Sequence, residues 1–195
     1  MASKINFNQV KKEISNNYKR AIERQGLSLA REILEENKNK YIDEIENHPV
    51  SKELQEGPEG ENLSDTLDGK ENLFAFIGFD VNRKPVKELT DFIKDNTSLD
   101  RKSIFDEEKL ELKFNVTTPS LDEIKSATPL PFEGGISWVK GIEDGISGFG
   151  YYVYGMFKQS RSKHGIQSKN KVRSLNYRPV KYMSELYNKF IKNLK

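Results

Sequence analysis

Cysteine is absent from this chain of 195 residues, and histidine occurs only twice, at His48 and His164. Without cysteine there are no disulfides, thiol nucleophiles or cysteine-zinc sites, which fits a reducing compartment. Neither histidine has a serine–acid partner or a neighbour at metal-ligand spacing. We therefore predict a protein that is not an enzyme and that has no catalytic centre, metal or cofactor.

Long apolar runs are also lacking. No stretch approaches the roughly 18 consecutive apolar residues of a membrane-spanning helix, and the opening MASKINFN has no apolar core typical of a signal peptide. We expect a soluble product that is made in a cytoplasm. Apolar residues make up 35% and charged residues 32% of the chain, so much of it must lie on solvated faces. The length fits one domain, or one domain with a helical arm.

The charge is sorted along the chain. Residues 151–195 carry eleven Lys/Arg and one acid, a net charge of +10, whereas residues 51–150 carry twelve Lys/Arg and twenty-one acids, a net charge of −9. Residues 1–50 have a net charge of +1, so the three blocks sum to the total of +2. Segregated charge creates a directional field, which affects partners more than fold. We predict a basic surface that is presented to an acidic partner.

The residue pattern predicts an α+β fold that begins with a long helix in residues 1–47. Apolar residues recur every three or four positions over 6–47, and Gly26 interrupts them, so we expect one long kinked helix or a helical pair. This helix either packs on the domain as a solvated amphipathic helix or pairs with the same helix of a neighbouring subunit. Its apolar positions are Phe7, Val10, Ile14, Tyr18, Ala21, Leu27, Ala30, Leu34, Tyr41 and Ile45.

Acid, glycine and proline dominate residues 48–71, which predicts an exposed loop. The α+β core is expected over 72–195. It begins with an apolar run at 72–79 that indicates a buried strand. Pro85 then marks the first turn of a helix.

The clearest strand signal is the alternation of apolar and polar residues over 109–117, which predicts part of a small mixed or antiparallel sheet. Ser120 and Glu123 form a capping-box pattern that opens a short helix. Apolar residues recur at helical spacing after Arg178, so an amphipathic helix over 179–194 is expected to close the domain.

Glycine and aromatic residues are concentrated in the next segment. Seven of the thirteen glycines lie between positions 134 and 155. This density indicates either a sharply turning strand–loop segment without a ligand or a surface that is pressed against another subunit. The glycine spacing matches neither a phosphate loop nor the dinucleotide-binding fingerprint. The aromatic residues predicted to anchor a subunit contact are Trp138, Phe149, Tyr151 and Tyr152.

Residues 158–173 (KQSRSKHGIQSKNKVR) carry six cationic side chains and no acid. They show neither strand nor helix periodicity, which predicts a basic loop. Such a loop is solvated, meets an acidic protein surface, or binds phosphates directly by releasing counterions. The interleaved aromatic residues of a single-strand binder are missing. The candidate partner-contacting residues are Arg161, Lys163, Lys169, Lys171 and Arg173.

One catalytic pattern stays open as a minor alternative. Glu111 and Lys113 on the predicted strand, preceded by upstream acids, resemble the acid…ExK arrangement of metal-dependent nucleases, in which carboxylates hold a divalent cation that activates water. An alternating strand needs polar residues on its outer face in any case, so we favour the structural interpretation. The upstream acids are Asp91, Asp95 and Asp100.

Four short stretches in the last third of the chain carry a family resemblance: GGISW at 134–138, SRS at 160–162, GIQ at 165–167, and the dipeptide Arg178-Pro179. This part of the chain resembles the neck and tail-completion proteins of tailed bacteriophages. Those small α+β virion proteins often combine an N-terminal helix with a sheet, a glycine-containing segment, a basic loop and a closing helix. The acidic segment 48–71 is not part of the resemblance.

The resemblance implies a structural virion protein, made in the bacterial host cytoplasm, that forms homo-oligomeric rings at the head–tail junction or tail end. Its partners would be neighbouring ring subunits and portal, neck or tail-tube proteins, with DNA passing along the ring axis and no membrane. The charge layout independently allows head-to-tail contacts that close into rings, with glycine and aromatic residues in the close-packed part of the contact. The alternative is a cytoplasmic nucleic-acid-binding protein that uses residues 158–173.

Overall fold

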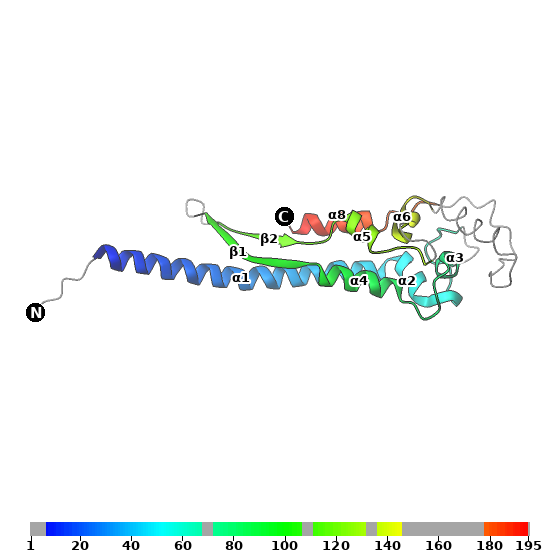
Figure 1. The fold of residues 1–195 in the computed structure, drawn as a ribbon, viewed down its shortest axis with the longest axis horizontal. Coiled ribbons are helices and arrows are strands. Elements are labelled where there is room, and N and C mark those ends of the chain that lie inside the picture. The colour runs from blue at the N-terminus through cyan, green and yellow to red at the C-terminus, as the bar shows by residue number, and fades with distance from the viewer. Residues whose placement is uncertain (1–6, 68–71, 107–110, 132–135, 146–177, 195) are drawn as a thin grey trace, which may run out of the picture.

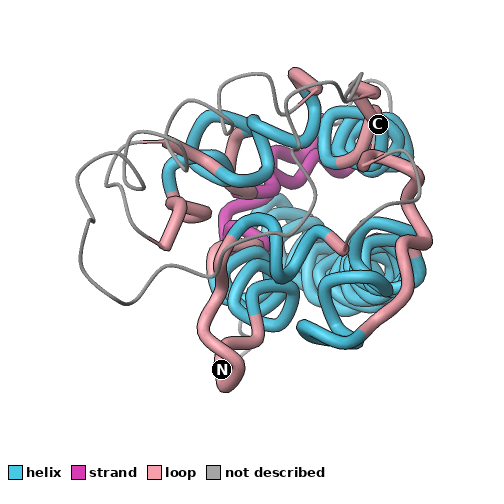
Figure 2. The backbone as a smooth tube through the Cα atoms, turned by 90° about the vertical axis from the view of Figure 1, so that its right-hand side faces the viewer, coloured by secondary structure: helices cyan, strands magenta, loops and turns pink. Residues whose placement is uncertain are grey.

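The computed structural model describes residues 7–67, 72–106, 111–131, 136–145 and 178–194. This part of the chain combines a long N-terminal helix, shorter helices and a two-stranded antiparallel sheet, so the predicted α+β class is confirmed. Figure 1 shows an elongated molecule in which the N-terminal half of helix α1 extends past the short helices, accompanied by the two strands. Seen end-on, the shorter helices group around the other half of α1 (Figure 2).

Helix α1 (Phe7–Asn47) is continuous over 41 residues, so the interruption expected at Gly26 does not occur. A Cβ atom at position 26 would lie 2.5 Å from Cδ1 of Leu112. Glycine at this position therefore lets strand β2 (Glu111–Thr117) approach the helix closely. Further along, the helix buries Leu34, Tyr41 and Ile45 against the core.

The predicted exposed loop over 48–71 is wrong for much of this segment. It contains helix α2 (Pro49–Glu56) and the 3-10 helix η1 (Gly57–Glu59). Pro49 occupies the first turn of α2, and Nδ1 of His48 accepts a hydrogen bond of 3.2 Å from the Val50 amide, which caps the helix. The composition was misleading because one of the acids, Glu53, is completely buried.

The apolar run at 72–79 forms helix α3 (Leu73–Ile77) instead of the predicted strand. The Asn72 side chain caps it by accepting a hydrogen bond of 2.9 Å from the Ala75 amide. Gly78 ends it in the left-handed conformation, with φ 77° and ψ 36°. A short run that is buried on several faces has no periodicity to separate helix from strand, so the two caps decide the outcome.

Two predicted helix starts are confirmed. Helix α4 (Pro85–Asp95) has proline in its first turn. Before α5 (Leu121–Ser126), the Glu123 carboxylate accepts from the Ser120 amide at 2.7 Å while the Ser120 hydroxyl accepts from the Glu123 amide at 3.3 Å. The hydrogen bonds from Ser120 lower the pKa of Glu123. The capping box is therefore formed as predicted.

The sheet pairs β1 (Ser98–Asp106) with β2 in antiparallel register. Strand β2 has the predicted alternation, with exposed and half-buried residues in turn. Strand β1 is irregular: from Leu99 to Ser103 it advances four residues while its partners Val116 and Phe114 are two residues apart. This bulge explains why β1 lacks a clean alternating pattern in the sequence.

Helix α8 (Met183–Asn193) closes the fold but begins later than position 179. Tyr182, just before it, is fully buried and its hydroxyl lies 2.6 Å from Oγ of Ser51, so the chain is held to α2 before the helix can start. The ring of Phe190 then stacks on that of Tyr41 in α1, with 4.5 Å between centroids. No helix in the described ranges is long and apolar enough to cross a membrane.

Candidate functional site

Most of the residues predicted to contact partners lie outside the described residues, and with them the whole basic segment 158–173. The structure does describe the residues on both flanks of segment 146–177. They belong to a junction between α5, α6 (Trp138–Glu143) and the first turn of α8. The predicted residues outside the described ranges are Phe149, Tyr151, Tyr152, Arg161, Lys163, Lys169, Lys171 and Arg173.

Trp138 is the predicted contact residue that the structure places, and its position corrects the prediction. Its side chain is 1% exposed, so a partner cannot reach it in the folded chain. The ring meets Phe79 edge-on at a centroid distance of 6.0 Å and lies 6.4 Å from the ring of Tyr182. Trp138 therefore anchors α6 in the core and does not anchor a protein interface.

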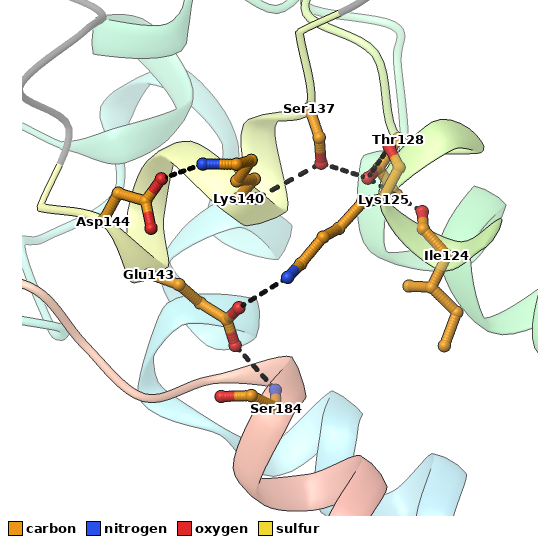
Figure 3. Close-up of polar contacts among 8 residues, drawn as sticks. All are labelled: Ile124, Lys125, Thr128, Ser137, Lys140, Glu143, Asp144 and Ser184. Carbon is orange, nitrogen blue, oxygen red and sulfur yellow. Dashed lines mark hydrogen bonds and ion pairs between the residues drawn. The ribbon is translucent and has the colours of Figure 1, made fainter. Parts of the chain in front are cut away.

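A chain of hydroxyls joins α5 to α6 (Figure 3). The Thr128 hydroxyl donates to the carbonyl of Ile124 at 3.0 Å and lies 2.8 Å from Oγ of Ser137. The two hydroxyls can share one hydrogen bond, because each is both a donor and an acceptor. Oγ of Ser137 in turn accepts from the Lys140 amide at 3.2 Å, which caps α6. These bonds position α6 against the end of α5.

Glu143 connects the same two helices to α8 (Figure 3). Its Oε1 accepts a hydrogen bond of 2.6 Å from the Ser184 amide, and its Oε2 lies 3.8 Å from Nζ of Lys125 in α5. A carboxylate at a helix N-terminus is favourable because it meets unpaired amides and the positive end of the helix dipole. One acidic side chain from α6 thus caps α8 and faces a cation of α5.

The junction also holds both flanks of segment 146–177 in one place. The Val180 amide donates to the Ile142 carbonyl at 3.3 Å. Arg178 forms an exposed ion pair of 2.9 Å with Asp65, in the segment that follows η1. The two flanks therefore meet beside α6, at the end of the molecule opposite the N-terminus of α1 (Figure 1).

A half-buried histidine, His48, packs against Tyr182 just before the first turn of α8. The His48 ring is 4.8 Å from the ring of Tyr182, between centroids. Burial lowers the pKa of His48 below its ordinary value of 6.5, and the nearby Glu185 opposes this shift. Burial also raises the pKa of the Tyr182 hydroxyl, against the effect of its hydrogen bond with Ser51. Neutral His48 with an unprotonated Nδ1 is the form that caps α2.

We expect mild acid to weaken the fold through His48. Its folded-state pKa is lower than the unfolded value of 6.5, so the unfolded chain binds the proton first as pH falls. The contribution of His48 to stability is therefore fully present above 6.5 and is lost as pH falls toward the folded pKa. Protonation of Nδ1 also removes an N-cap acceptor, which is worth about 1 kcal/mol.

Urea denaturation of the chain at a series of pH values from about 8 to 5 measures this effect. The matched variant is His48→Asn, because asparagine caps a helix well and does not titrate. We expect the free energy of unfolding of this variant to fall less between about pH 8 and pH 5 than that of the unmodified chain. Equal slopes for the two proteins would assign the pH dependence to other groups.

The nuclease-like pattern does not assemble into a metal site in the described part of the chain. Glu111 and Lys113 are both exposed and lie 3.7 Å apart as an ion pair on the outer face of β2. Asp91 forms an ion pair with Lys87 in α4. Among the described residues, no three His, Cys, Asp or Glu side chains are grouped so that they could hold a metal ion.

The geometry of the junction is suited to holding chain segments together. Its carboxylate, amine and hydroxyls pair with one another or with helix ends, and its aromatic rings pack into the core. Sequence reasoning missed Glu143, whose role depends on a helix 41 residues further along the chain. Comparison with protein-family models, with curated proteins and with solved structures found no match to this chain.

Proposed function

We propose that this chain is a structural assembly protein of a bacteriophage virion, a ring-forming subunit at the neck or tail end. The observation that carries the proposal is the charge distribution, with a net +10 over 151–195 and −9 over 51–150. When copies are related by rotation, the basic segment of one meets the acidic surface of the next. Such heterologous contacts form a closed ring when the rotation that relates neighbouring copies is a whole fraction of a full turn.

The described surface supplies an acidic partner for this contact. Glu56, Glu59 and Glu61 are all exposed around η1, in a block of sequence that carries most of the acids. The described flanks of segment 146–177 support the same proposal, because the hydrogen bond from the Val180 amide to the Ile142 carbonyl brings the two flanks together at one place on the core. Charge complementarity of this kind favours specific association.

Charge reversal in the basic segment tests the proposed function. Particles assembled with Arg161→Glu, Lys163→Glu and Arg173→Glu together should accumulate heads and tails that do not join. Like charges brought together at an interface cost several kcal/mol, so we expect infectious titre to fall by at least about 100-fold. Electron microscopy identifies the unjoined parts.

The matched control reverses three exposed lysines of the acidic block, with Lys52→Glu, Lys84→Glu and Lys94→Glu. This variant has the same change in net charge and should produce joined, infectious particles. Full infectivity of the variant at positions 161, 163 and 173 would overturn the proposed function.

The alternative is a cytoplasmic nucleic-acid-binding protein, which is favoured by six cations without an acid over 158–173. It predicts that the purified chain binds short duplex DNA, with log affinity falling by about 0.9 per neutralised phosphate for each log unit of salt. The same triple charge reversal should abolish that binding. Absence of binding at low salt, or a flat salt response, removes the alternative and leaves the assembly role.

A further inference from the structure

One side of α1 carries large apolar side chains that remain exposed in the folded chain. Tyr18 is 67% exposed, Leu29 57% and Ile33 47%. All three lie in the part of α1 that precedes its buried residues Leu34 and Tyr41. Exposed apolar side chains become informative when they share one face, because together they form a patch that a partner can cover.

The spacing of these residues places them on one face. Tyr18 and Leu29 are eleven residues apart, and so are the half-buried Ile22 and Ile33. Eleven residues make close to three turns of α-helix, so the four side chains form one straight stripe. We call Tyr18, Ile22, Leu29 and Ile33 the α1 stripe.

The α1 stripe is symmetric about a point between Gln25 and Gly26. Positions 18 and 33 are equidistant from this point, and so are positions 22 and 29. A second copy of the helix that runs in the opposite direction therefore places Tyr18 opposite Ile33 and Ile22 opposite Leu29. Each of these contacts is repeated by the two-fold axis.

Charge along α1 favours the same orientation. Residues 7–25 carry five Lys/Arg and two acids, a net charge of +3, whereas residues 26–44 carry three Lys/Arg and five acids, a net charge of −2. Antiparallel pairing about the midpoint of the stripe places the positive half of each helix beside the negative half of the other. Parallel pairing would place like charge beside like charge over the whole length.

We propose that the α1 stripe binds a second copy of this chain, giving an antiparallel dimer with its two-fold axis between positions 25 and 26. The occupant is another copy because an antiparallel copy of α1 matches this helix in two ways. Its apolar residues lie opposite those of the stripe, and its negative half lies beside the positive half. The stripe is short compared with a standard interface of about 800 Å² per partner, so we expect a dimer of micromolar affinity. The pairing goes beyond the proposed function and does not rest on it, because it does not use segment 158–173.

Sedimentation of the purified full-length chain over a concentration series tests the pairing. The unmodified chain should shift from monomer to dimer, and Leu29→Glu with Ile33→Glu should raise the dissociation constant at least about tenfold. The control is Leu63→Glu with Val81→Glu, which changes exposed apolar side chains elsewhere (42% and 69% exposed) and should leave the dimer intact. Circular dichroism confirms that both variants keep their helices.

Crosslinking determines the orientation, because the chain has no cysteine and a single introduced thiol reacts alone. Packed helix axes lie about 8–10 Å apart, a distance that a short bismaleimide can bridge. This reagent should therefore join two Gln25→Cys chains efficiently, because position 25 lies next to the two-fold axis. In the antiparallel dimer the Glu36→Cys thiols are displaced by 21 residues, about 32 Å along the axis, and should not be joined.

Three results would overturn the proposed pairing. The first is a chain that stays monomeric at all concentrations. The second is a dimer that survives the double substitution at positions 29 and 33. The third is efficient crosslinking at both position 25 and position 36, which would indicate parallel helices. Each is obtained with the purified chain, so the outcome is distinct from that of the particle-assembly experiment.

Discussion

Replacing Trp138 with alanine is expected to lower the free energy of unfolding by about 3–5 kcal/mol, the usual cost of deleting a large buried aromatic side chain. The Trp138 ring is 1% exposed and lies against the rings of Phe79 and Tyr182. Its loss leaves a cavity where α6 meets the start of α8. Urea denaturation followed by far-ultraviolet circular dichroism measures the change.

The fluorescence of Trp138 gives an independent measurement, because this is the only tryptophan in the chain. A core position predicts blue-shifted emission and slow quenching by acrylamide in the folded protein, both lost on unfolding. Trp138→Phe is the control, since it keeps much of the buried volume and should cost less than alanine. Rapid quenching in the folded chain, or a cost below about 1 kcal/mol for alanine, would contradict the core position.

The second large effect is expected for Glu53→Ala. Glu53 is fully buried, and its Oε2 accepts hydrogen bonds from the amide and hydroxyl of Ser64 at 2.9 and 2.5 Å. Its Oε1 accepts from the Leu73 amide at 2.6 Å. Alanine removes the acceptor for the buried Leu73 amide and for the half-buried Ser64 amide and hydroxyl. A buried donor left unpaired costs about 1–3 kcal/mol, and a half-buried donor costs less because water can reach it. We expect a total loss of about 3–5 kcal/mol in the free energy of unfolding.

The same substitution should release the segment that follows η1, because Glu53 joins α2 both to Ser64 and to the start of α3. Hydrogen exchange at the Ser64 and Leu73 amides should therefore accelerate. Glu53→Gln keeps one carbonyl acceptor and should show an intermediate loss. The matched control is Glu56→Ala, an exposed acid in the same helix, with an expected cost below about 1 kcal/mol. Equal costs at positions 53 and 56 would contradict the structural role of Glu53.

Some of the fold was predictable because it depends on residues close together in the chain. The alternation that predicts β2, the capping box of Ser120 and Glu123, and the helix start at Pro85 are confirmed. Each is decided by hydrogen bonds or side-chain directions within a few residues. The long helix over 7–47 belongs to the same group, apart from the interruption expected at Gly26.

The failed predictions concern residues whose environment comes from distant parts of the chain. Gly26 looked like a helix breaker, but Leu112 makes it a position of close packing. Glu53 looked like a solvated acid, but Ser64 and Leu73 supply the donors that allow its burial. Trp138 looked like an interface residue, because an aromatic residue in a glycine-rich stretch suits a surface contact as well as a core.

The features of the candidate site also fall into those that the sequence determines and those that the tertiary structure determines. Charge segregation, the basic segment 158–173 and the helical periodicity of α1 are properties of the sequence by itself, since composition and spacing determine them. Only the tertiary structure decided that Ile142 and Val180 meet, that Glu143 caps α8, and that three residues of the α1 stripe, Tyr18, Leu29 and Ile33, stay exposed. The physical reason is that burial and long-range hydrogen bonds depend on which segments pack together, and no short stretch of sequence contains that information.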